Sequence, residues 1–282
     1  MEGIEMKVGG VFSVGILLIL LLGVSSSFAQ KYEDVVYLKD GGVRRGLILE
    51  QVPNESVKLK TANGEIFVIK WSEISKILKE EKAAVLTPNP HYTRYFFAPN
   101  AFPLKKKSGY MQSTWLLGWS ANYGISDDTS IGFVTTIFGQ PFFVTPKIAV
   151  KVSDNWHMGG GVLLGYLGDP LGITYGLSTW GNIDKNVTVA LGWAFGGGDI
   201  HQSPMLSVNA MTRISNSWML MVESWMLTDE ASDAHILLYG VRWHRGGRNS
   251  LDAGFAIHRV VVEEWKNSFF PGFPCLNWTY GF

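Results

Sequence analysis

The chain has 282 residues, and its 24 Lys and Arg are balanced by 24 Asp and Glu. Zero formal net charge gives no electrostatic basis for nucleic-acid binding, and 46% hydrophobic residues exclude a disordered chain. With 32 glycines, 11 tryptophans and only 17% charged residues, the composition excludes a mostly helical protein and indicates β-structure.

Residues 1–29 have the pattern of a signal peptide. Lys7 precedes an apolar run over residues 11–24, and Ser27-Phe28-Ala29 forms a small-x-small cleavage site. The run is shorter than the roughly 18 apolar residues of a membrane-spanning helix, although an uncleaved anchor is the alternative. Cys275 is the only cysteine, so the chain can form no intrachain disulfide and has no lipidation site after the cleavage point. We therefore predict an exported protein, either a soluble β protein or a transmembrane β-barrel.

Residues 30–82 predict a small β module. Two hairpin turns are marked by Asp40-Gly41-Gly42 and by Asn63-Gly64, both of which favour positive φ angles. Residues 71–80 fit either a short helix or a last strand. Short strands over about fifty residues predict an SH3- or Sm-like fold. Residues 83–91 are a linker, because Pro88 and Pro90 block both a helix and a strand ladder.

Residues 92–282 alternate in polarity over segments of about ten residues. In one such segment Val189, Leu191 and Trp193 share a face and oppose Ala190 and Gly192. The apolar face collects aromatic side chains, including Trp119, Tyr175, Trp193, Tyr239 and Trp243, while the other face is small or polar. Aromatic residues outside and small or polar residues inside favour a lipid-facing barrel over a soluble sandwich.

Twelve strands are predicted, an even number that returns both barrel ends to one side of the membrane. Their expected ranges are 92–99, 109–123, 129–138, 142–152, 156–167, 171–182, 186–196, 204–214, 217–227, 235–245, 250–260 and 274–282. Tight turns follow the even-numbered strands, and most of the other connections are longer. Short turns of such barrels face the periplasm, so we expect the module of residues 30–82 to lie there. It could bind a periplasmic protein partner or plug the mouth of the barrel.

The chain ends in LNWTYGF, in which Leu276, Trp278, Tyr280 and Phe282 alternate with smaller or polar residues. This ending resembles the C-terminal signature of Gram-negative outer-membrane β-barrel proteins. The resemblance implies that the barrel-assembly machinery reads these residues and that the barrel lies in outer-membrane lipid.

The inward face carries a small set of charged or titratable residues, most of them on the later strands. They are Lys147, Lys151, Arg213, Glu223, Arg242, His244, Asp252 and His258. These residues could form the selectivity constriction of a narrow pore, or a salt-bridged network that fills and braces the lumen, since buried charges must be paired. A three-residue hairpin at residues 246–248 would place Arg242 opposite Asp252, whereas a five-residue hairpin would place His244 there.

The sequence therefore favours two functions equally: a narrow passive, porin-like pore, and a structural or interaction barrel. An enzymatic alternative is a lipid acyl hydrolase in which His235 activates Ser224 on the outward face near the extracellular rim. No third orienting residue is evident for that pair. The six histidines lack metal-ligand spacing, so we predict neither a metal nor a cofactor.

Overall fold

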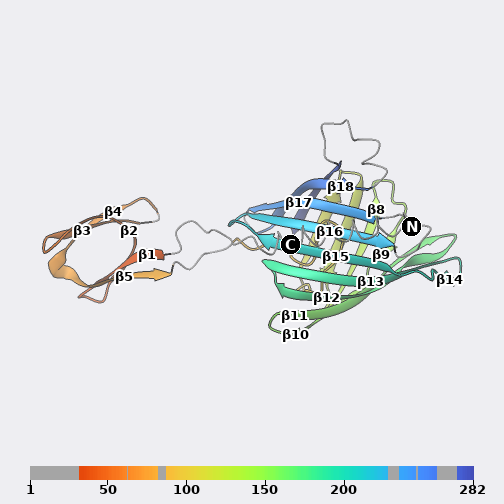
Figure 1. The fold of residues 1–282 in the computed structure, drawn as a ribbon, viewed down its shortest axis with the longest axis horizontal. Helices are drawn as coiled ribbons and strands as arrows, with labels where there is room; N and C mark the ends of the chain where they lie inside the picture. The colour runs from red at the N-terminus through yellow and green to blue at the C-terminus, as the bar shows by residue number, and fades with distance from the viewer. Residues whose placement is uncertain (1–31, 62, 82–86, 228–234, 246, 259–271) are drawn as a thin grey trace, which may run out of the picture. The chain divides into compact units, whose positions relative to one another are not determined.

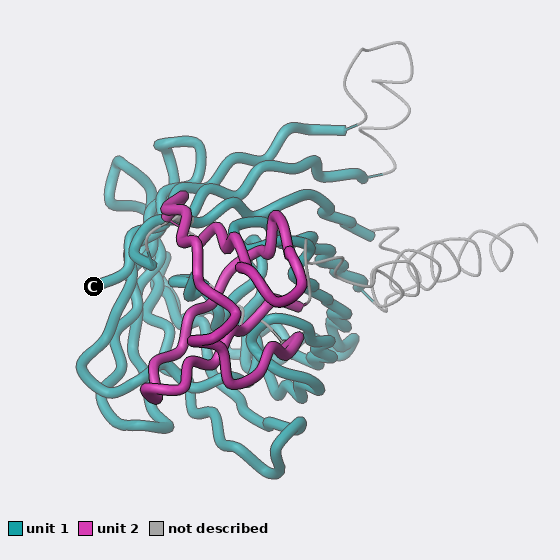
Figure 2. Tube along the Cα trace, turned by 90° about the vertical axis from the view of Figure 1, so that its left-hand side faces the viewer, with its two compact units in different colours: residues 1–26, 87–282 teal, residues 27–86 magenta. Residues whose placement is uncertain are grey.

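The computed structural model describes residues 32–61, 63–81, 87–227, 235–245, 247–258 and 272–282. The predicted signal peptide lies outside these ranges. The described residues fall into two compact units, one within residues 27–86 and one within residues 87–282 (Figure 2). No helix in the described ranges is long and apolar enough to cross a membrane.

The first unit is an antiparallel sheet of five strands in the order β4-β3-β2-β1-β5. Its elements are β1 (Tyr32–Leu38), β2 (Val43–Val52), β3 (Ser56–Lys60), β4 (Ile66–Lys70), η1 (Trp71–Glu73) and β5 (Ile74–Glu81). The side chains of Val36, Val57 and Leu59 form its buried core. The ambiguous stretch 71–80 is a single 3-10 turn followed by a strand. The predicted small β module is thus a five-stranded sheet.

The second unit is a closed antiparallel barrel of twelve strands (Figure 1), which confirms the predicted fold class. Its wall strands are β6 (Gly109–Thr114), β7 (Gly118–Gly124), β8 (Thr129–Thr136), β10 (Lys147–Ser153), β11 (Trp156–Leu167), β12 (Asp169–Asn182), β13 (Lys185–Gly196), β15 (Met205–Arg213), β16 (Trp218–Leu227), β17 (His235–Arg245), β18 (Asn249–Ile257) and β19 (Phe273–Gly281). Two short strands add to the wall. β9 (Phe143–Val144) precedes β10 and pairs with β8 and β11, and β14 (Asp199–Ile200) pairs with β13. The ring closes where β19 pairs with β6.

The strand count agrees with the prediction, but the first two wall strands differ from those predicted. Residues 92–99 do not form a wall strand, and residues 109–123 form two strands, β6 and β7, joined by a reversal at residues 115–117. Trp115 and Leu116 take positive φ angles of 53° and 61° at this reversal. Large side chains rarely adopt that conformation, and residues 115–117 contain no Gly or Asn, so local turn signals do not predict this reversal.

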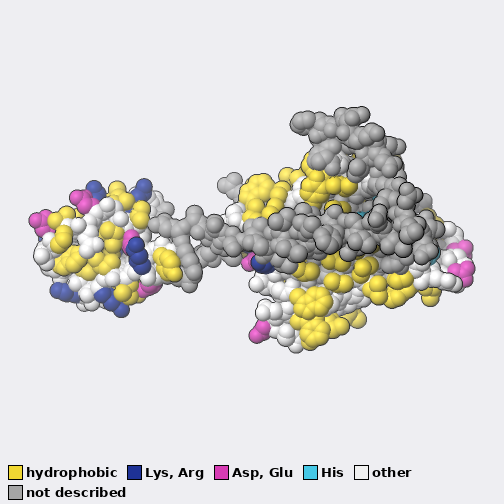
Figure 3. All heavy atoms as spheres, in the orientation of Figure 1, with side chains coloured by type: hydrophobic (Ala, Val, Ile, Leu, Met, Phe, Trp, Pro, Cys, Tyr) yellow, Lys and Arg dark blue, Asp and Glu magenta, His cyan; other side chains and the backbone are white. Residues whose placement is uncertain are grey.

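The outer face of the barrel is apolar, as the alternation predicted. Trp180, Trp218, Trp243 and Trp278 point outward and are exposed. On the visible face, hydrophobic side chains cover much of the wall and the few charged ones lie near its ends (Figure 3). Tyr175 is an exception to the prediction. It lies on the inner face of β12 and lines an internal cavity, because the alternation of β12 runs the other way: Ile173, Tyr175 and Leu177 face inward, while Thr174 and Gly176 are exposed outside.

The two ends of the barrel differ in their connections. The turns at residues 125–128, 154–155, 183–184, 214–217 and 246–248 share one end with the start of β6 and the finish of β19; we call this the turn end. Gly247, with φ of 77°, allows the tight turn between β17 and β18. The opposite, loop end carries the longer connections, together with two short ones at residues 115–117 and at Gly168. Of the longer connections, residues 228–234 and 259–271 lie outside the described ranges.

Candidate functional site in the barrel lumen

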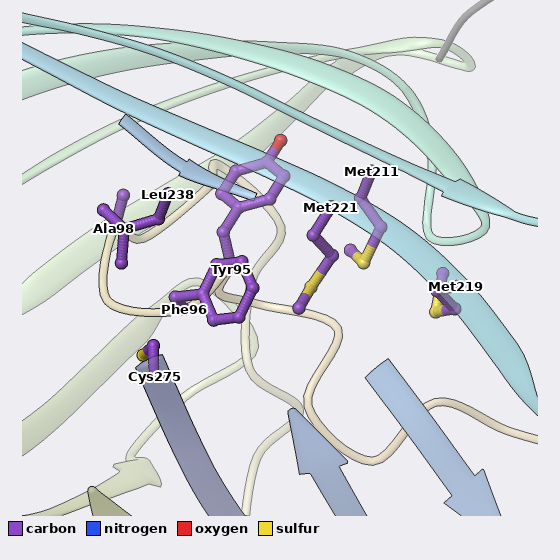
Figure 4. Close-up of a cluster of buried hydrophobic side chains, with 8 residues drawn as sticks. All are labelled: Tyr95, Phe96, Ala98, Met211, Met219, Met221, Leu238 and Cys275. Carbon is purple, nitrogen blue, oxygen red and sulfur yellow. The ribbon is translucent and has the colours of Figure 1, made fainter. Parts of the chain in front are cut away.

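A segment of the chain that precedes the first wall strand lies inside the barrel. We call residues 88–104 the inner segment. Its only described backbone pairing of strand type joins Arg94 and Pro99, and Tyr95 and Phe96 are fully buried. Figure 4 shows both aromatic side chains among inward residues of four wall strands: Met211, Met219, Met221, Leu238 and Cys275. The lumen is therefore packed at this level like a protein core.

The ion pair of Arg242 and Asp252 anchors the inner segment. The Arg242 guanidinium donates to Asp252 from Nε (2.7 Å) and from Nη2 (2.9 Å), and both side chains are fully buried. The same guanidinium donates to three backbone carbonyls of the inner segment, those of His91 (2.5 Å), Arg94 (3.1 Å) and Tyr95 (2.9 Å). The strand register pairs Arg242 with Asp252 across the three-residue turn, as the first of the two hairpin alternatives predicted.

Two further inward charges hold the inner segment. The carboxylate of Glu223, fully buried, accepts hydrogen bonds from the backbone N–H groups of Phe97 (2.9 Å) and Ala98 (3.0 Å). From the opposite wall, Lys147 Nζ donates to the carbonyls of Asn100 (3.0 Å) and Phe102 (3.1 Å). Each of these charges has the hydrogen-bonding partners that a buried ionised group requires.

Uncharged side chains complete the attachment. Gln112 Nε2 (2.9 Å) and Asn277 Nδ2 (3.2 Å) both donate to the carbonyl of Phe96. The Tyr95 hydroxyl donates to Asn186 Oδ1 (2.6 Å) and lies 2.8 Å from Thr188 Oγ1. Sequence reasoning missed these contacts, although a signal for them exists: the inward positions of β6, β13 and β19 carry amides and hydroxyls rather than glycine alone.

The remaining predicted lumen residues lie apart from this cluster. Near the turn end, Arg213 donates to Asp184 Oδ1 (2.6 Å from Nη2) and contacts His244 Nε2 (3.2 Å from Nη1). Lys151 is 57% exposed and pairs with Asp154 at 2.8 Å in the adjoining turn, so it lies at the rim of the barrel. His258 follows β18 and is partly buried. The structure thus joins Lys147, Glu223, Arg242 and Asp252 through the inner segment.

The lumen is not filled along its whole length. On the loop-end side of the inner segment lies a cavity of about 420 Å³, which we call the vestibule. A smaller space of about 20 Å³ lies beside the inner segment, against the inward residues of β6, β7, β8 and β10. Arg94, Pro99, Thr145 and Tyr175 line both spaces and so mark their junction.

Ser224 and His235 lie together on the outer face of the barrel. Ser224 Oγ is 3.0 Å from His235 Nε2, so the two side chains are within the hydrogen-bond reach that the hydrolase alternative required. Ser224 is fully buried among its outer neighbours. Within the described residues, no carboxylate hydrogen-bonds His235, and no group of His, Cys, Asp and Glu could hold a metal ion.

The C-terminal residues form the closing strand. On β19 the side chains of Leu276, Trp278 and Phe282 are exposed on the outer face, while Asn277 and Thr279 are buried inside. Backbone hydrogen bonds join Phe282 and Gly109 in both directions (2.8 and 2.9 Å). The alternating residues of the predicted assembly signature therefore occupy the outer side of the strand that closes the ring.

Searches with the sequence found no matching protein-family model and no matching curated protein. Similar solved structures include "KdgM porin in complex with disordered oligogalacturonate", with a TM-score of 0.43, 8% identity, and coverage of 62% of this chain and 95% of that chain. The NanC porin gives a TM-score of 0.41 and 9% identity, covering 62% of this chain and 97% of that one. OmpTdeltaL8, a loop-deletion mutant of an outer membrane protein of Vibrio cholerae, gives 0.33 and 11%, covering 89% and 96%. At these identities the likeness concerns the fold alone.

Proposed function

We propose that this chain is an outer-membrane β-barrel pore whose lumen is narrowed by its own residues 88–104. The observation that carries the proposal is the closed twelve-stranded wall with an apolar outer face and a hydrogen-bonded segment inside. Closure pairs every wall strand on both sides, which the absence of water in a bilayer core demands. An apolar outer face would be unfavourable in water and is favourable in lipid.

The connections support one orientation. All five connections at the turn end have four residues or fewer, and both barrel ends lie there. In outer-membrane barrels the short turns face the periplasm. Residue 87, where the chain enters the barrel, would then lie on the periplasmic side together with the five-stranded module. A periplasmic protein partner is the occupant we propose for that module, and the barrel-assembly machinery is the proposed reader of Leu276, Trp278, Tyr280 and Phe282.

A narrow passage would run from the vestibule along the inner segment. The 20 Å³ space at the junction is bounded by Arg94 and Pro99 on one side and by Asn122, Thr145 and Lys147 on the other. A space of this size holds about one water molecule. The passage therefore admits little more than water in this structure, and movement of the inner segment would widen it.

Single-channel conductance of residues 30–282 refolded into a planar bilayer tests the proposal. We expect small discrete steps from the wild type. Replacing residues 95–102 with an equal-length Gly-Ser linker should enlarge the steps several-fold, because the Arg242–Asp252 pair remains intact while the packed aromatic side chains are removed. The matched control replaces residues 197–204, a loop-end connection of the same length, and should leave the steps unchanged.

If none of the three proteins shows conductance steps, although each is shown to be inserted in the bilayer, the pore function is wrong. The alternative, a structural or interaction function of the barrel, would then be favoured, and the next step would be to identify the protein that binds the N-terminal module.

A lipid-active hydrolase is the second candidate, because Ser224 and His235 lie 3.0 Å apart on the outer face. Ser224→Ala should abolish acyl release from phospholipid vesicles if this pair is catalytic. An equal rate in the variant and the wild type would remove the candidate.

A further inference from the structure

The vestibule has a wall unlike that of the occupied part of the lumen. Most of its inward side chains are apolar and come from strands around the ring and from the inner segment: Phe97, Val134, Phe143, Leu163, Ile173 and Trp225. Its volume of about 420 Å³ lies within the range of roughly 300–1,000 Å³ typical of small-molecule sites. A water-filled passage for sugars or ions would not require so apolar a lining.

The charged region of the vestibule, among the residues that the structure describes, lies at its junction with the smaller space, while Thr114, Ser120, Thr136 and Ser207 add uncharged polar groups elsewhere in the lining. Among the described residues that line the vestibule, Arg94 is the only charged one. Arg94 Nε, Gln112 Oε1 and Thr145 Oγ1 are buried and have no hydrogen-bond partner among the described residues. Buried polar atoms are normally satisfied by protein, water or ligand, so the donors Arg94 Nε and Thr145 Oγ1 are open to an acceptor on a ligand.

We propose that the vestibule binds a monocarboxylate with a single apolar chain, its carboxylate at Arg94 and its chain along the apolar wall. A guanidinium forms strong charge-assisted hydrogen bonds with a carboxylate, and Arg94 is the charged residue that the described lining of the vestibule offers. A sugar would bury hydroxyl groups against hydrocarbon without partners, at a cost in free energy. The proposal goes beyond the pore, because it requires the barrel and its inner segment but not conduction.

Binding of radiolabelled decanoate to the full chain in phospholipid nanodiscs tests the proposal, with empty nanodiscs as background. Decanol serves as the uncharged ligand of equal chain length. Arg94→Gln removes the cation, and Arg248→Gln is its control, because Arg248 is an exposed arginine in the turn after β17. Ala190→Trp fills the vestibule from the inner face of β13, and Ala253→Trp places the same side chain on the outer face of β18.

We expect saturable binding of one decanoate per chain. Arg94→Gln should weaken decanoate binding about tenfold or more and leave decanol binding unchanged. Ala190→Trp should abolish binding of both ligands, while Arg248→Gln and Ala253→Trp should match the wild type.

Three outcomes would overturn the proposal. The wild type binds no decanoate above background; Arg94→Gln binds decanoate as tightly as the wild type; or Ala190→Trp retains full binding, which would locate the ligand on the outer surface. None of these outcomes depends on conductance. The binding experiment therefore tests the vestibule site, and the conductance experiment tests the pore, independently of each other.

Discussion

The lumen has two parts with different linings: the part occupied by the inner segment, and the vestibule on its loop-end side. In the occupied part, the charges of Lys147, Glu223 and Arg242 are buried and each hydrogen-bonds the backbone of the inner segment. In the vestibule, Arg94 is the only charged lining residue that the structure describes, and the rest of the wall is mostly apolar. One barrel thus contains both a packed core, in which buried charges hydrogen-bond the inner segment, and a mostly apolar vestibule.

The difference shows that the inner segment and the wall charges depend on each other. An ionised side chain inside the barrel needs partners, and the irregular backbone of residues 88–104 offers unpaired carbonyl and N–H groups that a regular strand would use in its ladder. On the loop-end side of this segment, the described wall residues that line the vestibule are uncharged. Variants in the two parts of the lumen should therefore respond differently.

The largest effect is expected for Asp252→Ala. This change leaves the Arg242 guanidinium fully buried without its counterion, and breaking a buried ion pair in this way costs about 3–5 kcal/mol. The free energy of unfolding, followed by tryptophan fluorescence during urea titration in phospholipid vesicles, should fall by that amount. Asp252→Glu should lose less, because it keeps a carboxylate beside the guanidinium and leaves the Arg242 donors to the inner-segment carbonyls in place. Equal losses in the two variants would contradict the pairing argument.

Glu223→Gln should cost somewhat less. The Glu223 carboxylate accepts from two backbone N–H groups and from Trp225 Nε1, and a glutamine must turn its NH₂ group toward one of these donors. Hydrogen bonds to charged groups contribute about 1.5–3 kcal/mol, so the same titration should show a loss of this size. The control is Glu55→Gln, at an exposed position of the N-terminal module, which should show none.

The sequence predicted what depends on local periodicity. Alternation along each strand identified the twelve-stranded class and the outward tryptophans, and the spacing around residues 246–248 allowed the pairing of Arg242 with Asp252. The inner segment could not be predicted in this way. The Phe96 carbonyl is bonded by Gln112 and Asn277, so its position is fixed by residues distant in sequence, and its irregular backbone has no period to detect. The strand predicted at residues 92–99 is therefore absent from the wall, where the structure has irregular backbone inside the barrel.

A pair of size changes sharpens the comparison of the two parts of the lumen. Ala101 is fully buried in the inner segment, and its N–H donates to Thr179 Oγ1, so Ala101→Leu should overpack the core and cost about 1–3 kcal/mol. Ala190 faces the vestibule, and Ala190→Leu should leave the free energy of unfolding unchanged or slightly raise it. A loss of equal size in both variants would mean that the vestibule is as tightly packed as the occupied part.

The smallest effect is expected for Lys151→Gln, which removes an ion pair of the same chemistry at the exposed rim. Lys151 Nζ lies 2.8 Å from Asp154 Oδ1, but water reaches both side chains, and exposed pairs contribute little. The hydrogen bond and positive charge of Lys151 lower the pKa of the Asp154 carboxyl. Any stabilisation is therefore present above the ordinary Asp pKa and is lost as pH falls through the lowered value. At neutral pH the urea midpoint of the variant should lie within error of the wild-type value. In acid, where Asp154 is protonated, the two midpoints should also be equal. A shift comparable to that of Asp252→Ala would show that burial is not what separates the two pairs.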